Sequence, residues 1–583
     1  MTGGERPWLR EYASGVPASV TPVHATVLDA FLHTAAARPD HVVLRFGAHA
    51  HTAREADEVS DRIAAALAAR GFGRGDRLAI HLQSVPEFVL AMLGVWKLGG
   101  IIVTVNPMYR ERELDEVLRD SGAKVLLCEA NERLAATQAV AMRAGVGWVV
   151  ACGGEASAAV AAERDAVTGE RDVMPAERDA VTATQPAAKA AGASPVEAGA
   201  LHGPAGEARC TDWSQLLALG AAAPMPAPSS RARPADAATF IYTSGTTGPM
   251  KAAVSTHAQL AYSADVYRVW CGVAADDTIV AIAPLVHVTG IVGYIALALA
   301  ASATLVLTYR FTPQAFRDAV RTHRAGFTIG PTTAFIALTA AADVEPDDLA
   351  SLDRPFSGGA PIPAAVVERY RAKFGHDILG IYGMTESTGP THMVPRGRQA
   401  PIDAGSGTLS VGVPVPGIDC DIVGDDGRPL PPLSPGEIVL RGPQLASGYW
   451  QRDAETRSTF TAQGLRTGDI GFMDADGWLY VIDRKKDQIN ASGFKVWPRE
   501  VEDVLYEHPA VLECAVIGQH DDYRGETVVA CIALRPGSQA TAEELAAFCR
   551  DRMAVYKVPR TFRFLSELPK TASGKVLRRE LRT

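Results

Sequence analysis

The segment from Tyr242 to Lys251 carries residue types that are suited to binding phosphate. It reads Tyr-Thr-Ser-Gly-Thr-Thr-Gly-Pro-Met-Lys and directly follows the apolar stretch AATFI. Glycines and small hydroxyl residues leave backbone N–H groups accessible and add hydroxyl donors, and the lysine supplies a positive charge. A Walker P-loop fits poorly, because Ala252 stands where that motif has its Mg²⁺-binding hydroxyl. The segment therefore predicts a nucleotide-phosphate loop of another kind, with a solvated Thr/Gly loop as the alternative.

Further segments follow this loop in a fixed order, and together they resemble the adenylate-forming superfamily. That superfamily includes acyl-CoA synthetases, luciferases and nonribosomal peptide adenylation domains. The segments are APLVHVTG (283–290), SGGAPIP (357–363), YGMTES (382–387), SVGVPVPG (410–417), RTGDIG (466–471), DRKKDQINASGFKVWPREVE (483–502) and PKTASGKVLRREL (569–581). The resemblance covers nearly the whole chain apart from residues 152–210.

Carried over position by position, the resemblance implies a complete ATP site. The phosphate-binding residues would be Thr243, Ser244, Gly245, Thr246, Thr247, Gly248 and Lys251. The adenine and ribose would be bound by Gly358, Gly359, Ala360, Tyr382, Gly383, Met384, Asp469 and Arg484. Thr385 would contact phosphate, and Glu386 would hold Mg²⁺ together with the Thr243 hydroxyl. These roles suit the side chains, since a carboxylate is a hard ligand for Mg²⁺ and an aromatic face stacks on a base.

The resemblance also assigns residues near the C-terminus. Lys575 would bridge the substrate carboxylate and the α-phosphate, where negative charge accumulates during adenylation. The stretch from Asp483 to Lys486 matches the family's hinge, with Lys486 at the pivot. After adenylation the small domain of relatives rotates and exchanges the lysine for a loop that lines the pantetheine channel. Gly493 and Lys495 stand in that loop.

One departure from the family pattern falls at the end of the phosphate loop. Most relatives have x-Pro-Lys-Gly there, whereas this chain has Pro-Met-Lys-Ala, so Met250 and Ala252 are atypical. We expect a slightly different loop geometry with Lys251 in its usual place.

The acyl pocket is expected around His287, Thr289 and Gly290. Amino-acid-activating relatives carry an Asp in this stretch, but residues 285–288 offer no carboxylate. An amino-acid substrate is therefore not expected. The segments PWLREYASGVPASV (7–20) and NPMYRERELDEVLRDSGAKVLLCE (106–129) look most like those of medium- and long-chain fatty-acid CoA ligases. Aryl-acid CoA ligases are the alternative. Coenzyme A is the predicted thiol, and a free acyl carrier protein is the alternative.

A catalytically inactive scaffold of the same fold is the non-enzyme alternative. The chain keeps every charged residue that the family's chemistry needs, which argues against a scaffold. These residues are Lys251, Glu386, Asp469, Arg484 and Lys575.

Around these residues, apolar runs alternate with amphipathic helices from Gly71 to Cys128 and again from Ala237 into the 380s. This alternation predicts an α/β fold whose parallel sheets are covered by helices. From about Thr408, short strands with Gly/Pro/Asp turns predict a β-rich subdomain. We predict a large N-terminal domain (1–483) and a small, mobile α+β C-terminal domain (484–583). Residues 152–210, rich in Ala, Glu and Gly, are expected to form a flexible insertion.

The bulk composition agrees with a globular enzyme. The net charge of −9 argues against a nucleic-acid binder, and 47% of the 583 residues are hydrophobic. The eight cysteines lack metal-ligand spacing and are expected to be reduced core residues. The apolar run Gly290 to Tyr309 is interpreted as a buried helix followed by a buried strand. Because no apolar signal opens the chain, we predict a cytoplasmic location. The sequence makes no prediction of oligomeric state.

Overall fold

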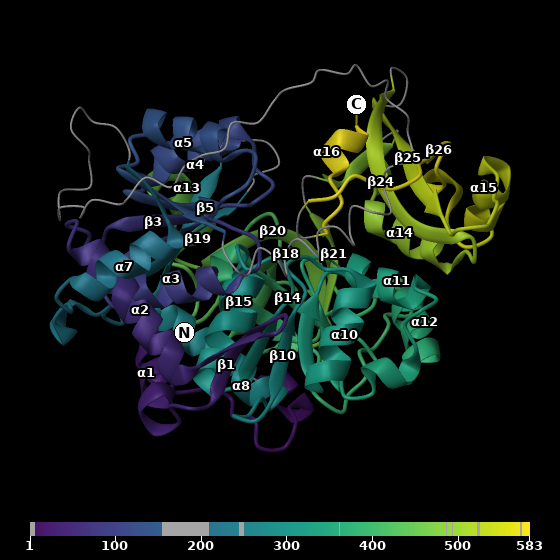
Figure 1. Ribbon diagram of the computed structural model, residues 1–583. Helices are drawn as coiled ribbons and strands as arrows, with labels where there is room; N and C mark the ends of the chain where they lie inside the picture. The colour runs from purple at the N-terminus through teal and green to yellow at the C-terminus, as the bar shows by residue number, and fades with distance from the viewer. Residues whose placement is uncertain are drawn as a thin grey trace, which may run out of the picture.

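The computed structural model describes residues 6–153, 209–243, 250–360, 362–484, 487–491, 494–521, 525–571 and 574–582. The predicted flexible insertion therefore lies almost entirely outside the described residues. The described strands form four sheets. Two large sheets stack with helices into one body, and the other two are smaller (Figure 1).

The first large sheet has seven strands in the order β7-β6-β5-β3-β4-β8-β9. All neighbours are parallel except β8 and β9, which form an antiparallel hairpin. This confirms the parallel sheet predicted from the alternating pattern. The strands are β3 (Arg77–His81), β4 (Ile101–Thr104), β5 (Val125–Glu129), β6 (Trp148–Cys152), β7 (Arg209–Asp212), β8 (Ala237–Thr243) and β9 (Lys251–Thr256).

Helices cover both faces of this sheet. Ala79 packs in a cluster with helices α4 and α5, whereas its neighbours Leu78 and Ile80 pack in the cluster that contains α2 and α3. Alternate side chains of one strand thus face opposite layers, as the pleat requires. The helices are α2 (Ala53–Ala68), α3 (Pro86–Trp96), α4 (Glu111–Ser121), α5 (Leu134–Arg143) and α7 (Trp213–Ala222).

The second large sheet has nine strands in the order β16-β15-β14-β13-β12-β10-β11-β1-β2, parallel from β14 to β1 and antiparallel at both edges. Its strands are β1 (Val42–Phe46), β2 (His49–Thr52), β10 (Thr278–Ala281), β11 (Thr304–Leu307), β12 (Phe327–Gly330), β13 (Arg354–Ser357), β14 (Leu379–Met384), β15 (Gly389–Met393) and β16 (Val413–Pro414).

A shared core joins the two large sheets. One apolar cluster contains Phe31 of α1, Phe88 of α3 and Leu260 of α8, together with residues of both sheets. A second cluster lies on the far face of the nine-stranded sheet, under α10, α11 and α12. The helices of these layers are α1 (Val27–Ala37), α8 (His257–Cys271), the π-helix η3 (Thr289–Ala296), α9 (Leu297–Ala301), α10 (Pro313–His323), α11 (Thr332–Ala340) and α12 (Ala364–Phe374).

The apolar run from Gly290 to Tyr309 folds as the sequence predicts. It forms η3 and α9, turns at Ser302 with a φ of 55°, and continues as β11. In the described part of the chain, no helix has the length and apolar character needed to cross a membrane.

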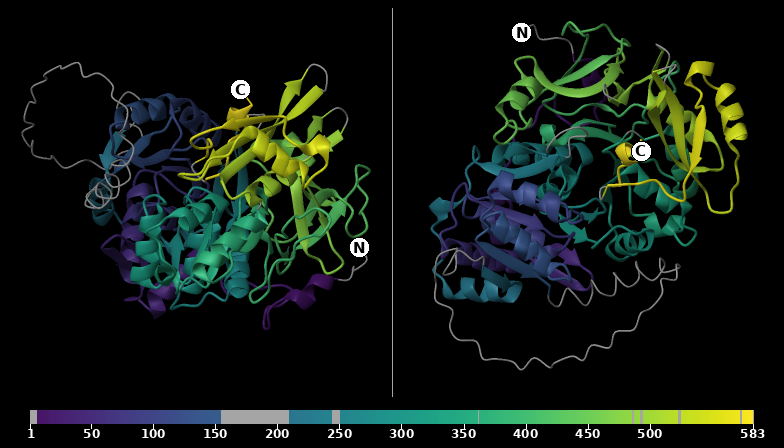
Figure 2. Two further views of the ribbon diagram at one scale, coloured as in Figure 1. Left: turned by 90° about the vertical axis from the view of Figure 1, so that its right-hand side faces the viewer. Right: turned by 90° about the horizontal axis from the view of Figure 1, so that it is seen from above.

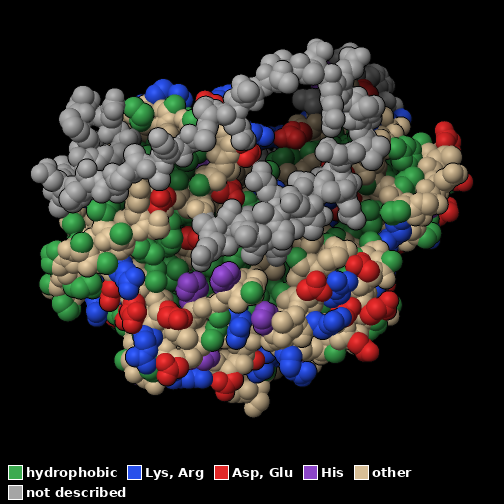
Figure 3. Space-filling view, in the orientation of Figure 1, with side chains coloured by type: hydrophobic (Ala, Val, Ile, Leu, Met, Phe, Trp, Pro, Cys, Tyr) green, Lys and Arg blue, Asp and Glu red, His purple; other side chains and the backbone are tan. Residues whose placement is uncertain are grey.

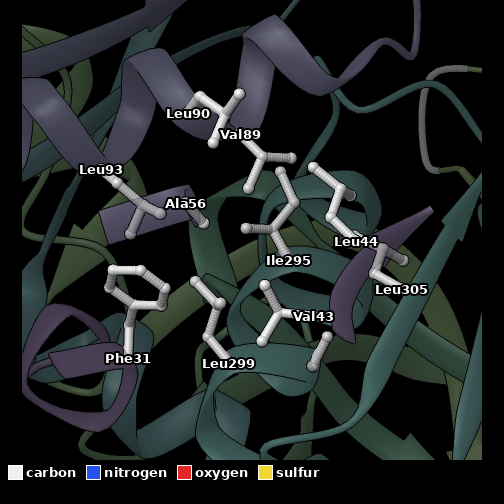
Figure 4. Close-up of a pocket in the computed structure, with 11 residues that line it drawn as sticks. Phe31, Val43, Leu44, Ala56, Val89, Leu90, Leu93, Ile295, Leu299 and Leu305 are labelled. Carbon is white, nitrogen blue, oxygen red and sulfur yellow. The ribbon is translucent and has the colours of Figure 1, made fainter. Parts of the chain in front are cut away.

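A small apolar hollow lies between the two large sheets (Figure 4). It is lined by aliphatic side chains and Phe31, from α1, β1, α2, α3, η3, α9 and β11. Its volume of about 10 Å³ is near the smallest that can hold one water molecule. The hollow therefore cannot be a substrate pocket.

The predicted β-rich subdomain is present as an antiparallel sheet of five strands. Its start differs from the prediction, because β16 pairs with β15 in the nine-stranded sheet and the small sheet begins only at Asp419. Its strands are β17 (Asp419–Val423), β18 (Gly436–Arg441), β19 (Phe460–Thr461), β20 (Gly464–Met473) and β21 (Leu479–Arg484), with helix α13 (Asp453–Thr459) between β18 and β19.

The described chain after residue 487 builds a separate α+β unit, seen at one side of the large body (Figure 2). Its helix α14 packs beside α12, and the two share an apolar cluster. The domain boundary at 483/484 stays a prediction, and β21 extends to Arg484. The elements are β22 (Ile489–Ala491), β23 (Phe494–Val496), α14 (Pro498–Glu507), β24 (Val511–Asp521), β25 (Gly525–Leu534), α15 (Ala542–Arg550), β26 (Thr561–Phe564) and α16 (Arg578–Leu581).

The cysteines mostly follow the prediction. All eight are free thiols and seven are buried, but Cys210 on β7 is exposed and is therefore not a core residue. Among the residues that the structure describes, no group of three or more His, Cys, Asp and Glu side chains could hold a metal ion by itself.

Candidate active site

The residues predicted to bind adenine meet at the ends of β13 and β14. These strands run parallel, with Ser357 opposite Gly380, so Gly358, Gly359 and Ala360 follow one strand while Tyr382 lies on the other. A Cβ on Gly358 would lie 2.6 Å from Cγ2 of Ile381. Gly359 has a φ of +80°, a conformation that glycine adopts without strain. Glycine thus allows the chain to pass close to β14.

Asp469 sits at the centre of the predicted ribose site. It is only 8% exposed. Its Oδ2 accepts a hydrogen bond from the Tyr382 hydroxyl at 2.7 Å, and its Oδ1 lies 3.3 Å from Nε of Arg484. Since Asp469 and Arg484 are register partners on β20 and β21, the small sheet itself fixes this pair. A carboxylate has about four acceptor positions, so Asp469 can also accept bonds from vicinal hydroxyls.

The turn after Tyr382 presents Thr385 and Glu386. Gly383 is required there, because its Cβ would lie 2.3 Å from the carbonyl oxygen of Gly389. Met384 donates its N–H to the Ser387 hydroxyl at 3.0 Å, and residues Thr385–Ser387 form the short helix η5. The turn is therefore held by an internal hydrogen bond and by the close approach of Gly383 to Gly389.

Glu386 is almost completely buried, with 7% exposure. The Tyr449 hydroxyl donates to its Oε1 at 2.7 Å. Burial and the neighbouring Glu386 carboxylate raise the pKa of Tyr449, so this tyrosine stays a hydrogen-bond donor. Tyr449 thereby fixes the orientation of the carboxylate.

The base of the phosphate loop also lies near Tyr449. Thr243 and Lys251 are register partners at the end of the β8–β9 hairpin. The Lys251 ammonium lies 5.6 Å from the centre of the Tyr449 ring and 4.0 Å from Oε1 of Glu455. Ser244, Gly245, Thr246, Thr247 and Gly248 lie outside the described residues. The described ends of the loop and Glu386 are thus brought together around one tyrosine.

These residues fit a magnesium ion that is held jointly by protein and nucleotide. Glu386 offers a buried carboxylate, and Thr243 offers a hydroxyl at the loop base. Mg²⁺ in such sites is bound by one or two carboxylates plus substrate phosphates. The donor set of this chain has that chemistry.

Lys575 reaches the same site from the C-terminal unit. Its loop forms a tight turn in which Thr571 donates its N–H to the carbonyl oxygen of Lys575 at 2.8 Å. The Thr333 hydroxyl, on α11 of the large body, donates to the carbonyl oxygen of Gly574 at 3.1 Å.

The electrostatic surroundings of Lys575 agree with this placement. Lys575 is an exposed residue by its accessible surface, although neighbouring protein atoms crowd around its ammonium and bury it in part. This burial and the Arg484 guanidinium lower the pKa of Lys575 to about 8, while the Asp469 carboxylate opposes the shift. The structure therefore brings the catalytic lysine predicted from the sequence to the predicted ribose residues.

The predicted acyl-pocket residues lie beside Lys575. Burial and the Lys575 ammonium lower the pKa of His287 to about 4, so its imidazole is neutral. Thr289 begins η3. A Cβ on Gly290 would lie 2.3 Å from Cα of Leu285, which explains the glycine. The neutral imidazole of His287 therefore lies near the predicted catalytic lysine.

The predicted hinge and channel residues are not part of this arrangement. Lys486 and Gly493 lie outside the described residues, and Lys495 is exposed on the β22–β23 hairpin in a different sheet. The sequence analysis missed Tyr449 and Thr333. Tyr449 follows Gly448 in the run SGYW, which carried no chemical signal of its own because an aromatic after a glycine is usually a packing residue.

Charged side chains are mixed over the visible surface. On the face shown in Figure 3, acidic and basic groups are interspersed along the lower half and do not gather in one basic area.

Comparison with known proteins identifies the family. Residues 31–450 match the AMP-binding enzyme family, and residues 500–575 match the AMP-binding enzyme C-terminal domain. The chain belongs to the AMP-binding enzyme family. This confirms the predicted membership of the adenylate-forming superfamily and, at the level of the family, the prediction of an AMP-forming acid–CoA ligase.

Individual relatives span nearly the full chain. A long-chain-fatty-acid–CoA ligase of Bacillus subtilis (strain 168) is 31% identical over 99% of this chain and 98% of its own length. A feruloyl-CoA synthase of Amycolatopsis sp is 31% identical over 93% of this chain and 96% of its own. The crystal structure of an anthranilate CoA ligase in complex with anthranoyl-AMP superposes with a TM-score of 0.81 and 26% identity, covering 97% of this chain and 98% of that one. The predicted fold class is confirmed.

Proposed function

We propose that this protein converts a medium- to long-chain fatty acid, ATP and coenzyme A into acyl-CoA, AMP and diphosphate through an acyl-adenylate. The observation that carries the proposal is the approach of Lys575, from the C-terminal unit, to the Asp469–Arg484 pair of the small sheet. Such an approach suits a reaction in which carboxylate and α-phosphate must be held together.

In the first half-reaction, the carboxylate oxygen attacks the α-phosphorus of ATP and diphosphate leaves. Tyr382 stacks on the adenine and Asp469 accepts bonds from the ribose hydroxyls. Lys251 and Thr385 bind phosphate oxygens. Glu386 and Thr243 would hold Mg²⁺, which would supply positive charge to the phosphates. The Lys575 ammonium bridges carboxylate and α-phosphate and stabilises the charge that develops between them.

In the second half-reaction, the coenzyme A thiol attacks the acyl carbonyl carbon and AMP leaves. We assign the pivot to Lys486 and the pantetheine channel to Gly493 and Lys495, and these assignments rest on the family resemblance. The names of the relatives favour coenzyme A over a carrier protein as the acceptor. A cytoplasmic location stays a prediction.

The choice of a fatty acid rests on two observations. The imidazole of His287 is neutral, and residues 285–290 include no carboxylate that could pair with an amino-acid ammonium. Several relatives are long-chain-fatty-acid–CoA ligases. Aryl acids are the second candidate, because a feruloyl-CoA synthase is similar to the same degree.

The experiment is a measurement of diphosphate release with ATP and a panel of fatty acids, aryl acids and amino acids, each with and without coenzyme A. We expect fatty acids to support the fastest release and to yield a thioester. Faster turnover of aryl acids would favour the second candidate. Turnover of amino acids alone would contradict the proposal, since a buried ammonium without a partner is strongly unfavourable.

A further inference from the structure

Two carboxylates of helix α4 contact the residues that begin and end the phosphate loop. Asp120 Oδ2 accepts a hydrogen bond from the Tyr242 hydroxyl at 2.7 Å. Glu116 Oε1 accepts one from the backbone N–H of Met250 at 3.1 Å. The two acids are four residues apart, so they lie on one face of the helix. A single rigid helix thus holds both ends of the loop.

Asp120 also binds the segment that follows β18. Its Oδ1 lies 2.5 Å from Nη2 of Arg452, and its carbonyl oxygen accepts from Nε1 of Trp450 at 3.1 Å. The backbone N–H of Trp450 donates to the carbonyl oxygen of Ala252 at 2.9 Å. This segment carries Tyr449, which orients Glu386. Asp120 therefore lies where the phosphate loop and the support of the magnesium ligand meet.

The negative charge of Glu116 and Asp120 indicates that these residues support the loop and do not bind the phosphates. A carboxylate close to a triphosphate site raises the energy of the bound anion, so it does not serve as a direct ligand there. Arg452 compensates the charge of Asp120, and Glu116 uses its oxygen for a backbone N–H. A hydrogen bond to a charged acceptor is among the stronger ones in proteins and fixes geometry. The two acids therefore fix the positions of Tyr242 and Met250.

We propose that Glu116 and Asp120 are positioning residues for ATP binding and adenylation, which hold Tyr242 and Met250 at the two described ends of the phosphate loop and take no part in thioester formation. The inference rests on the proposed function. Glu116 contacts the backbone of Met250, whose side chain is buried in the apolar cluster with α4 and α5.

The test compares Glu116→Ala with Glu116→Gln, which keeps an acceptor oxygen. Asp115→Ala is the matched control, since it removes a carboxylate from the same helix whose partner is Arg119. The affinities for ATP and AMP are measured by calorimetry. Diphosphate release and thioester formation from chemically supplied acyl-adenylate are measured separately.

We expect Glu116→Ala to raise the dissociation constant of ATP about tenfold, because loss of a hydrogen bond to a charged group has an effect of that order. Glu116→Gln should restore affinity to within about threefold. AMP has no β- and γ-phosphates, so its affinity should stay within about twofold. Thioester formation and both affinities of Asp115→Ala should be unchanged.

Tyr242→Phe provides a second test, because it removes only the hydroxyl that binds Asp120 and should weaken ATP but not AMP. Equal loss of ATP and AMP affinity, equal effects of Ala and Gln at position 116, or an unchanged ATP affinity in both Glu116→Ala and Tyr242→Phe would overturn the inference. Failure of the proposed substrate would be recognised separately, as absence of turnover in the unmodified protein while ATP still binds.

Discussion

The strongest prediction concerns Lys575, whose removal should separate the two half-reactions. In Lys575→Ala, no ammonium bridges the carboxylate and the α-phosphate. The loss of one preorganised charge of this kind is worth about 3 kcal/mol, so acyl-adenylate formation should fall about 100-fold or more. Thioester formation from supplied acyl-adenylate and coenzyme A should persist, because the bond that Lys575 helps to form already exists in that substrate.

The lowered pKa of Lys575 gives the same prediction a pH dependence. The active form is the ammonium, and the free protein loses this proton as the pH rises through about 8. The kcat/KM for ATP, which reports the free enzyme, should therefore be constant well below pH 8 and fall above it, to about a tenth at pH 9. In Lys575→Arg this alkaline decline should disappear, since a guanidinium keeps its proton.

The assays are diphosphate release between pH 6 and 10 and thioester formation from acyl-adenylate, after a check of folding by circular dichroism. Equal loss of both activities in Lys575→Ala would show that the lysine is structural or shared. An unchanged alkaline decline in Lys575→Arg would show that another group titrates. The first result would refute the assignment of Lys575 to adenylation, and the second would refute the deprotonation of Lys575 as the cause of the alkaline decline.

Three further predictions concern the supports of the site. Arg578→Ala should lower the free energy of unfolding by about 3 kcal/mol in chemical denaturation, because the buried carboxylate of Asp483 and the half-buried carboxylate of Glu502 lose a cationic partner. An unchanged value would contradict the importance of this ion-pair network. Burial raises the pKa of Asp483 to about 6, so the folded protein binds this proton more tightly than the unfolded chain does. The free energy of unfolding should therefore fall as the pH rises from about 4 to about 6. In Asp483→Asn the melting temperature should depend less on pH over this range, and the same pH dependence as in the unmodified protein would refute the reasoning. Gly290→Ala should destabilise by about 1 to 3 kcal/mol, because the new Cβ meets Cα of Leu285; a melting temperature equal to that of the unmodified protein would show that the backbone adjusts freely.

The sequence predicted the fold class, and it named residues for an ATP site that lie together in the structure. Residues such as Tyr382, Asp469 and Arg484 occur in ordered motifs, and the structure places them in direct contact. The helix and strand between Gly290 and Tyr309 followed from their composition alone. These predictions rest on local composition or on different motifs that follow one another in a fixed order along the chain.

The supporting residues could not be found in the same way. Asp120 meets Arg452 across 332 positions of sequence, and Tyr449 meets Glu386 across 63. An acid on an amphipathic helix and an aromatic after a glycine have no distinctive pattern, because their roles come from tertiary contacts. The exposure of Cys210 was missed for a related reason, since it depends on the position of β7 at the edge of its sheet.

The apolar cluster under α10, α11 and α12 continues into the C-terminal unit, where it includes Val501 and Leu505 of α14. If this unit rotates between the half-reactions, part of that contact must open to water. Exposure of apolar surface raises the heat capacity. The free-energy difference between the two orientations would therefore depend on temperature in a curved, non-linear way. Temperature would then change the balance between adenylate formation and thioester formation, even where the chemistry of each step is unaltered.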